Sequence, residues 1–173
     1  MHARPKSHLL LLGALLTTAA ATAFAPSSAG AFEPVISMSE GRVAIHPGGS
    51  PAEVLATREQ TGGQFSAIIL SDATGGGGPG PAIVHANESE VWFVLEGTYE
   101  FHVGNKVVEG GPGTFIAIDA SQPHGYITKT AGKVLAIFTP GGYEHFFMDW
   151  DKQGLKPGPD LGKLEQSYGV TRP

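Results

Sequence analysis

The fold is decided by one stretch, Ile83-Val84-His85-Ala86-Asn87-Glu88-Ser89-Glu90-Val91-Trp92-Phe93-Val94-Leu95-Glu96-Gly97. His85 lies among apolar neighbours, and the carboxylate of Glu90 follows five residues later. The apolar run after Glu90 predicts a strand that ends at the Glu-Gly turn. This pattern is typical of a strand that carries ligands into a barrel, so the remaining chain is expected to build that barrel.

The first 31 residues resemble a secretory leader rather than part of the fold. Arg4 and Lys6 precede an apolar run from Leu9 to Phe24, and no acidic residue occurs in this segment. Ala29-Gly30-Ala31 offers the small-x-small pattern of a cleavage site. We therefore expect residues 1–31 to be a signal peptide and the mature protein to be secreted or periplasmic. An uncleaved membrane anchor is the alternative, although the run is shorter than the ~20 apolar residues that cross a bilayer.

Composition limits the function of the predicted mature chain, which has the size of a single domain. Without Arg4 and Lys6, the predicted mature chain has 9 basic and 16 acidic residues, and its sequence contains no cluster of basic residues. A nucleic-acid partner is therefore not expected, nor a membrane partner once the leader is cleaved. The chain has no cysteine, which excludes thiolate metal sites and cysteine nucleophiles.

Strand-like segments recur about every ten residues, with Gly-, Pro- and Asn-containing turns between them. One or two strands are expected within residues 33–50, and others at 52–56, 64–71, 98–103, 106–109, 114–118, 124–128 and 133–138. This spacing indicates an all-β barrel or sandwich over residues 32–150. Residues 143–150 are expected to form a short helix that caps the barrel, because their aromatic residues recur every three or four positions. Residues 151–173 are expected to be a loosely held C-terminal tail.

The central stretch resembles the first signature motif of the cupin superfamily, Gly-x5-His-x-His-x3–4-Glu-x6-Gly. Gly77, His85, Glu90 and Gly97 match that motif, and Ile83 stands at the position of its first histidine. In another register His85 would take the first histidine position, with a shorter gap to Glu90. Both registers leave the motif one histidine short.

A later segment resembles the second cupin motif, Gly-x5-Pro-x-Gly-x2-His-x3-Asn. The chain has Gly113, Asp119, Ser121, His124 and Thr128 at these positions, so the histidine is kept and the proline and asparagine are replaced. Together with the segments at 94–97 and 139–147, the motifs resemble small single-domain bacterial cupins of the quercetin-dioxygenase-like group. The resemblance implies a double-stranded β-helix, or jelly-roll, barrel with a short C-terminal helix.

Three residues are the candidate metal ligands: His85, Glu90 and His124. Strand alternation can direct all three into one cavity, and two imidazoles with one carboxylate suit a divalent transition metal such as Fe, Mn, Ni, Co, Cu or Zn. The alternative is a site that has lost its metal, in which His85 and Glu90 are hydrogen-bonded to each other or to Tyr126. Glu88 is expected to face solvent. The cavity is expected to be lined or backed by Trp92, Phe93, Tyr99, Phe101 and Phe115.

Two functions remain open for this site. The first is a quercetin-dioxygenase-like oxygenase that acts on a small hydroxylated aromatic, with Glu90 also serving as the catalytic base. The second is a non-catalytic small-ligand-binding or sensor cupin, which the missing histidine favours. The resemblance also implies a possible homodimer that pairs through edge strands within residues 33–56.

Overall fold

The structure is a computed structural model that describes residues 32–40, 42–72 and 80–173, and in these residues it is mostly β-sheet. The predicted leader at 1–31 and the glycine run that contains Gly77 lie outside the described residues. No helix in the described residues is long and apolar enough to cross a membrane. The elements are β1 (Val43–Ile45), η1 (Pro47–Gly49), β2 (Ala52–Ala56), β3 (Ser66–Asp72), β4 (Gly80–His85), β5 (Ser89–Glu96), β6 (Tyr99–Val103), β7 (Lys106–Gly110), β8 (Phe115–Ile118), β9 (His124–Thr128), β10 (Gly132–Thr139), α1 (Glu144–Gln153), α2 (Pro159–Ser167) and β11 (Val170–Thr171).

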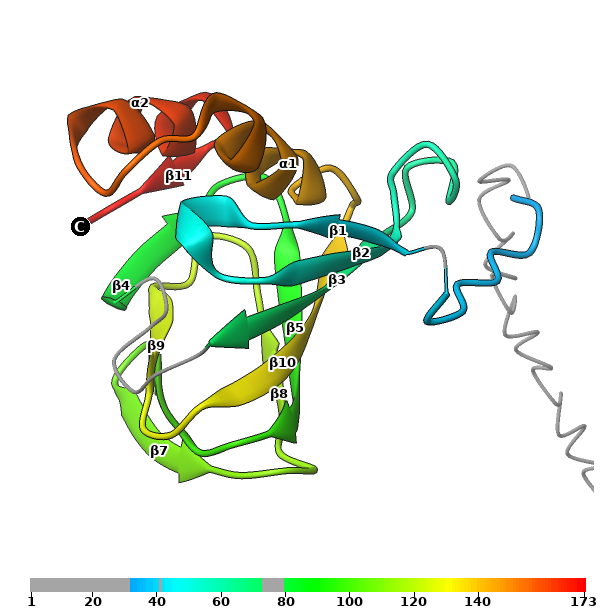
Figure 1. Cartoon of the computed structure of the whole chain (residues 1–173). Coiled ribbons are helices and arrows are strands. Elements are labelled where there is room, and N and C mark those ends of the chain that lie inside the picture. Colours follow the sequence, from blue (N-terminus) through cyan, green and yellow to red (C-terminus); the bar gives the residue numbers. More distant parts are fainter. Residues whose placement is uncertain (1–31, 41, 73–79) are drawn as a thin grey trace, which may run out of the picture.

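Two antiparallel sheets face each other and form a barrel (Figure 1). One sheet has the strand order β1-β2-β3-β10-β5-β8, and the other has the order β11-β4-β9-β6-β7. Non-consecutive strands such as β5 and β10 are therefore neighbours, as in a jelly roll. The all-β fold predicted from the sequence is confirmed.

The inner faces of both sheets form one hydrophobic core. Along β10 the buried residues alternate with less buried ones, as expected for a strand with one face inside. Trp92, Tyr99 and Phe101 are almost fully buried, as the sequence predicts. Phe93 and Phe115 are not, since they are 37% and 64% exposed. These two residues pair with each other across β5 and β8 on the outer face, so the prediction that they line or back the cavity is wrong.

The tight turn between β5 and β6 requires glycine at position 97. Gly97 has a φ of +79°, a value that side-chain-bearing residues rarely adopt. A Cβ atom there would lie 2.5 Å from the backbone oxygen of Ala131. The Glu-Gly turn signal in the sequence therefore reflects both the backbone conformation and the close approach of the turn before β10.

The C-terminal segment packs against the barrel instead of forming a loose tail, so that prediction is wrong. Helices α1 and α2 and strand β11 lie together across one end of the barrel (Figure 1). Leu161 of α2 and Val170 of β11 are buried, and β11 pairs with β4, with Val170 opposite His85. The backbone N–H of Ala86 also donates to the carbonyl oxygen of Gly169 over 3.0 Å. The chain's last residues therefore fix the end of the strand that carries His85.

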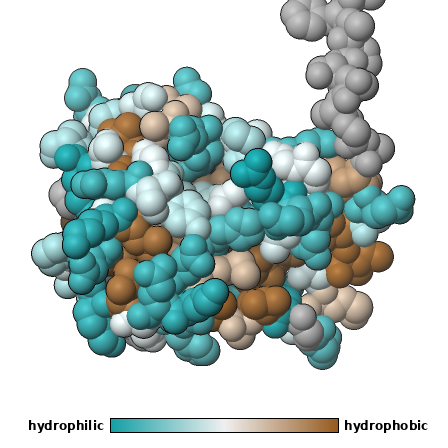
Figure 2. Space-filling model, turned by 90° about the horizontal axis from the view of Figure 1, so that it is seen from above, coloured by the Kyte–Doolittle hydropathy of each residue, from teal (hydrophilic) through white to brown (hydrophobic). Residues whose placement is uncertain are grey.

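Most of the outer surface on the helical side is hydrophilic, with hydrophobic residues in separate patches (Figure 2). The apolar side chains of the C-terminal helices are directed inwards. Tyr143, Phe146 and Leu161 belong to the same buried cluster as the barrel core. The helices therefore extend the core and also cover that end of the barrel.

Candidate metal centre

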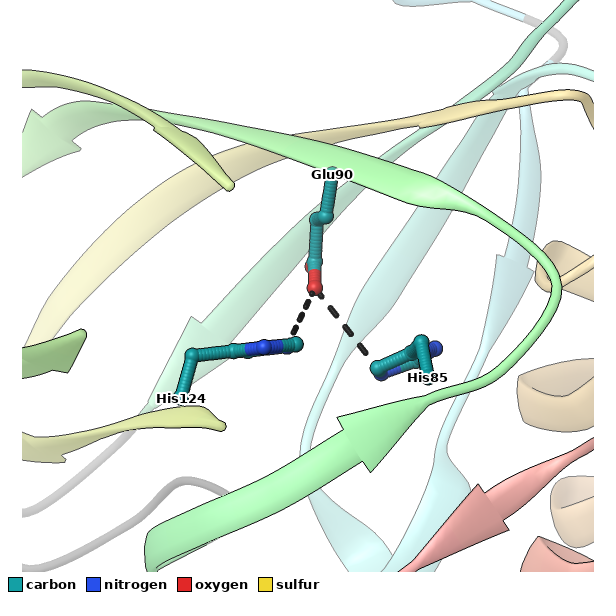
Figure 3. A group of neighbouring side chains, drawn as sticks. All are labelled: His85, Glu90 and His124. Atoms are coloured by element: carbon teal, nitrogen blue, oxygen red, sulfur yellow. Dashed lines mark hydrogen bonds and ion pairs between the residues drawn. The ribbon is translucent and has the colours of Figure 1, made fainter. Parts of the chain in front are cut away.

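Three strands bring the predicted ligands together inside the barrel. His85 ends β4, Glu90 lies near the start of β5, and His124 begins β9. Both histidines are 1% exposed and Glu90 is 5% exposed. Figure 3 shows the carboxylate of Glu90 between the two imidazoles, and one potential ligand atom from each residue lies within 4.8 Å of the other two.

The carboxylate of Glu90 is oriented by the strand that carries it. Trp92, two residues later on the inner face of β5, donates its indole N–H to Glu90 Oε1. The other oxygen, Oε2, lies 3.2 Å from His124 Nε2 and 3.8 Å from His85 Nε2. One oxygen is thus held by Trp92, while the second points at both histidines.

Each histidine is held in the tautomer that suits a metal ligand. His85 Nδ1 lies 2.6 Å from Glu88 Oε1, and His124 Nδ1 lies 2.6 Å from the carbonyl oxygen of Gln122. A carboxylate and a carbonyl can only accept, so both Nδ1 atoms carry the proton in these bonds. Both Nε2 atoms therefore have a lone pair for a metal, which is the arrangement found when a carboxylate or carbonyl orients a metal-binding histidine.

Glu88 is part of the site, and the prediction that it faces solvent is wrong. It lies in the bend between β4 and β5, is 7% exposed, and turns back towards His85. Strand alternation does not apply to Glu88, because β5 begins only at Ser89. A His-x-x-Glu spacing across a tight bend is the sequence signal that points to this contact.

Burial and charge have opposite effects on the pKa of His124. Burial alone lowers this pKa, because it disfavours the imidazolium. The hydrogen bond and negative charge of Glu90, with the carbonyl of Gln122, outweigh burial, so the pKa is raised above its usual range. Without a metal, the surroundings of His124 therefore favour its protonated form more than water does.

The donor set fits a divalent transition metal. Two neutral nitrogen ligands and one carboxylate oxygen meet at one point, which is the set used by non-heme iron and related centres with open positions. Calcium prefers more oxygen ligands. The structure thus contains a candidate ligand group, and the binding of a metal to it stays a prediction.

Ile83 forms an apolar wall at this site. It is 5% exposed, lies opposite His124 in the pairing of β4 with β9, and lines the same cavity as His85. The position of the first motif histidine thus faces the cavity but offers no ligand atom. Tyr126, which the sequence suggests as a hydrogen-bond partner for the site, also lines this cavity, and none of the hydrogen bonds between described residues links it to His85 or Glu90.

Tyr143 covers the other side of His85. Its ring meets the His85 ring edge-on, with 4.3 Å between the ring centroids, and it is almost fully buried just before α1. Burial is the main cause that raises the pKa of Tyr143 well above its usual range. The tyrosine therefore stays neutral and keeps water away from the imidazole.

A cavity of about 260 Å³ opens from this group towards the C-terminal helices. Its walls come from β2, β3, β4, β5 and β9 and from the C-terminal segment. Sequence reasoning missed the contribution of that segment and of η1. The lining residues outside the metal group include Pro47, Leu70, Asp72, Trp92, Phe147, Trp150, Leu161, Glu165 and Arg172.

A second cluster, Glu59, Glu144 and His145, is better explained by structure than by metal binding. The two oxygens of Glu144 accept the backbone N–H groups of Arg58 and Gly142, over 2.7 and 2.9 Å. Glu144 thereby ties the turn after β2 to the start of α1. Both of its oxygens therefore already accept hydrogen bonds that hold the fold together.

The fold and the site together define a small jelly-roll barrel with a two-histidine, one-carboxylate group inside. Residues 71–145 match the family model Cupin_2, described as a cupin domain. Residues 71–145 therefore carry a cupin domain, and the chain has the cupin fold.

Individual relatives agree with this family but differ in how much they cover. Quercetin 2,3-dioxygenase of Bacillus subtilis (strain 168) is 29% identical over 98 residues, which are 54% of this chain and 28% of that protein. The chain therefore spans little more than a quarter of that relative. An RmlC-like cupin from Shewanella frigidimarina superposes with a TM-score of 0.56 at 19% identity, over 65% of this chain and 96% of the other. KdgF from Halomonas sp. gives a TM-score of 0.52 at 15% identity, over 64% of this chain and 98% of the other. At these identities the superpositions show the fold alone.

Proposed function

We propose that the protein is a metal-dependent oxygenase that acts on a small hydroxylated aromatic compound. The convergence of His85 Nε2, His124 Nε2 and Glu90 Oε2 in a buried cavity carries this proposal. The similarity to a quercetin dioxygenase supports the reaction class, although it covers a minor part of that protein. When bound, a divalent metal supplies Lewis acidity that lowers the pKa of a phenolic oxygen, and open positions for substrate and dioxygen.

The residues of this chain have separate roles in the proposed reaction. His85, His124 and Glu90 would hold the metal, and Glu88 and the Gln122 carbonyl keep the two imidazole rings oriented. Glu90 would also act as the base: its Oε2 would switch from metal ligand to acceptor of the proton from the substrate hydroxyl, while Trp92 holds its other oxygen. The apolar and aromatic cavity walls exclude water, which strengthens the electrostatic interactions inside.

The experiment combines metal analysis with dioxygen uptake. The protein would be produced without residues 1–31, loaded in turn with Fe, Mn, Ni, Co and Cu, and offered catechols and flavonols. We expect one bound metal per chain and substrate-dependent dioxygen consumption, both lost in His85→Ala and His124→Ala. An absence of dioxygen consumption with every metal and substrate would refute the oxygenase.

A second candidate function is favoured by Ile83, whose buried side chain leaves the group one histidine short of the family motif. In this function the protein binds a small ligand in the barrel without converting it. Metal-free protein of normal stability that still binds catechols would support this function over the enzyme.

Export of the mature protein also belongs to this proposal. The basic start, the apolar run and the small residues at 29–31 support it. The mass of the protein recovered outside the cytoplasm would show whether the chain is cut after Ala31. We further propose a small molecule as the partner, a possible homodimer, and no nucleic-acid partner, in line with the excess of acidic residues.

A further inference from the structure

The outer face of the six-stranded sheet carries two rows of apolar side chains. Leu135 of β10 lies beside Ile69 of β3 on one side and beside Phe93 of β5 on the other. Phe93 in turn pairs with Phe115 of β8, so the first row crosses these strands without a polar residue. The second row runs next to it and consists of Ala67, Ile137, Val91 and Ala117. We call the residues of these two rows the sheet-face patch.

This patch is open to solvent within the described part of the chain. Phe115 is 64% exposed and Phe93 is 37% exposed, and Leu135 is half-buried. The C-terminal helices lie across one end of the barrel, and no helix among the described residues covers this sheet (Figure 1). An aromatic side chain has a surface of roughly 200 Å², so the two phenylalanines alone expose about that area. Contiguous apolar patches of this kind mark interaction sites.

The other sheet shows the outer face that this barrel has where it meets water. On β6 the outward positions are Glu100 and His102, and Glu109 of β7 lies opposite Glu100. Glu100 also forms ion pairs with His102 and Lys129. An antiparallel sheet with one solvated face normally has such polar outward residues. Contact with solvent therefore does not explain the composition of the sheet-face patch.

Charged residues beside the patch are paired within the same chain. Glu53 lies opposite Ile69 on β2 and contacts Arg42 over 2.8 Å. At the end of β10, Lys133 contacts Glu96 over 2.9 Å. The patch thus has the apolar centre and polar rim of a protein interface, and its rim offers no excess charge that an oppositely charged partner would match. A second copy of the chain fits it, because a two-fold axis packs one apolar face against the same face.

The size of the sheet also fits a second copy. Strands lie about 4.8 Å apart and rise about 3.3 Å per residue, so each strand residue covers about 16 Å² of sheet. The strands of this sheet are three to eight residues long and together present a face of about 550 Å². Two such faces bury about 1,100 Å², which exceeds the area of about 1,000 Å² expected of a biological interface.

We propose that the sheet-face patch is the interface of a homodimer in which the outer faces of two six-stranded sheets pack together around a two-fold axis. This inference specifies the homodimer of the proposed function, but it depends on neither the metal nor the oxygenase reaction. It also differs from a dimer that pairs through edge strands within residues 33–56. Along β5, Val91 and Phe93 face the partner, whereas Glu90 and Trp92 face the cavity. The partner therefore supports the strand that carries Glu90 from behind.

Sedimentation equilibrium on the chain without residues 1–31 tests this interface. We expect dimers at micromolar concentration, with or without metal. Phe93→Thr and Phe115→Thr keep the strand propensity but remove the aromatic rings. A central interface residue contributes a factor of about 30 or more to affinity, and each substitution occurs twice in a two-fold dimer, so each variant should raise the dissociation constant about 1,000-fold. The matched control Val107→Thr should leave it unchanged, because Val107 is 61% exposed on the other sheet.

Thiol protection gives a second readout that does not depend on the phenylalanine variants. The chain has no cysteine, so Ala117→Cys places a single thiol within the patch and Val107→Cys places one outside it. At micromolar concentration the thiol of Ala117→Cys should react with a maleimide more slowly than after dilution to the monomer. The thiol of Val107→Cys should react at the same rate in both conditions.

The outcomes separate this interface from the alternatives. Monomers at every concentration would overturn it, as would a dimer that survives in both phenylalanine variants. A dimer that is lost in Val43→Lys, on the exposed edge strand β1, but kept in Phe93→Thr and Phe115→Thr would overturn it in favour of edge-strand pairing. Equal reactivity of the Ala117→Cys thiol before and after dilution would overturn it even if a phenylalanine variant fails to fold. A dimer that shows no dioxygen uptake would remove the oxygenase and leave the interface standing.

Discussion

Removal of the Glu88 carboxylate should weaken metal binding without touching a metal ligand. Glu88 Oε1 accepts the proton of His85 Nδ1 over 2.6 Å at a buried position, so it fixes the ring and makes Nε2 more basic. Loss of such a hydrogen bond lowers metal affinity about 10- to 100-fold, which corresponds to about 1.4–2.7 kcal/mol. We expect Glu88→Gln near the lower limit, because its amide oxygen can still accept the proton, and Glu88→Ala near the upper limit.

The assay is a competition titration of Zn²⁺ or Co²⁺ between the protein and a chromophoric chelator at fixed pH. Glu100→Gln is a matched control, because Glu100 also bonds a histidine, His102, over 2.9 Å, but on the half-exposed face of β6. Its metal affinity should equal that of the unaltered protein. The reasoning would be refuted by unchanged affinity in Glu88→Ala, or by an equal loss in Glu100→Gln.

Three further predictions concern the ligand set, the pH dependence and the C-terminal segment. Ile83→His should raise metal affinity in the same titration, because position 83 faces the cavity opposite His124; equal or weaker binding would contradict this geometry. Metal affinity should fall as pH drops through the raised pKa of His124, above the usual value of about 6.5, because protonation removes a ligand. In metal-free protein the same raised pKa stabilises the folded state at low pH, and this contribution is lost as pH rises through it. Melting temperatures of metal-free protein should therefore fall as pH rises through the pKa of His124, and His124→Gln should lose this part of the pH dependence. Leu161→Ala should lower the free energy of unfolding by about 2 kcal/mol or more in urea titrations, whereas an unchanged value would mean that α2 does not pack against the barrel.

The barrel could be predicted from the sequence because its strands obey a simple period. The sequence predicts a strand at residues 124–128, and in the structure β9 runs from His124 to Thr128. A proline-containing turn comes directly before His124, the first residue of this strand. The start of the strand, and with it the side of the sheet to which His124 points, therefore follow from local signals. The outward position of Phe93 follows from the same period, since Glu90, Trp92 and Val94 share the inner face of β5.

Other features of the site could not be predicted because they depend on tertiary contacts. Glu88 lies in the bend before β5, and only the folded shape of that bend brings its carboxylate to His85. Residues 153–173 are mostly polar and contain several glycines and prolines, a composition typical of a loose tail. Their few apolar residues, such as Leu161 and Val170, are nevertheless buried against the barrel.

The pairing of β11 with β4 makes the end of the chain a working part of the cavity wall. Arg172, which follows Val170 and Thr171 of β11, lines the cavity. A purification tag fused after residue 173 would therefore start close to a side chain that lines the cavity. The tag would also disturb β11, the short strand whose pairing with β4 holds the backbone at His85 in place. A version shortened to the matched residues 71–145 would lose this wall altogether, and its ligand preferences would not represent those of the full chain.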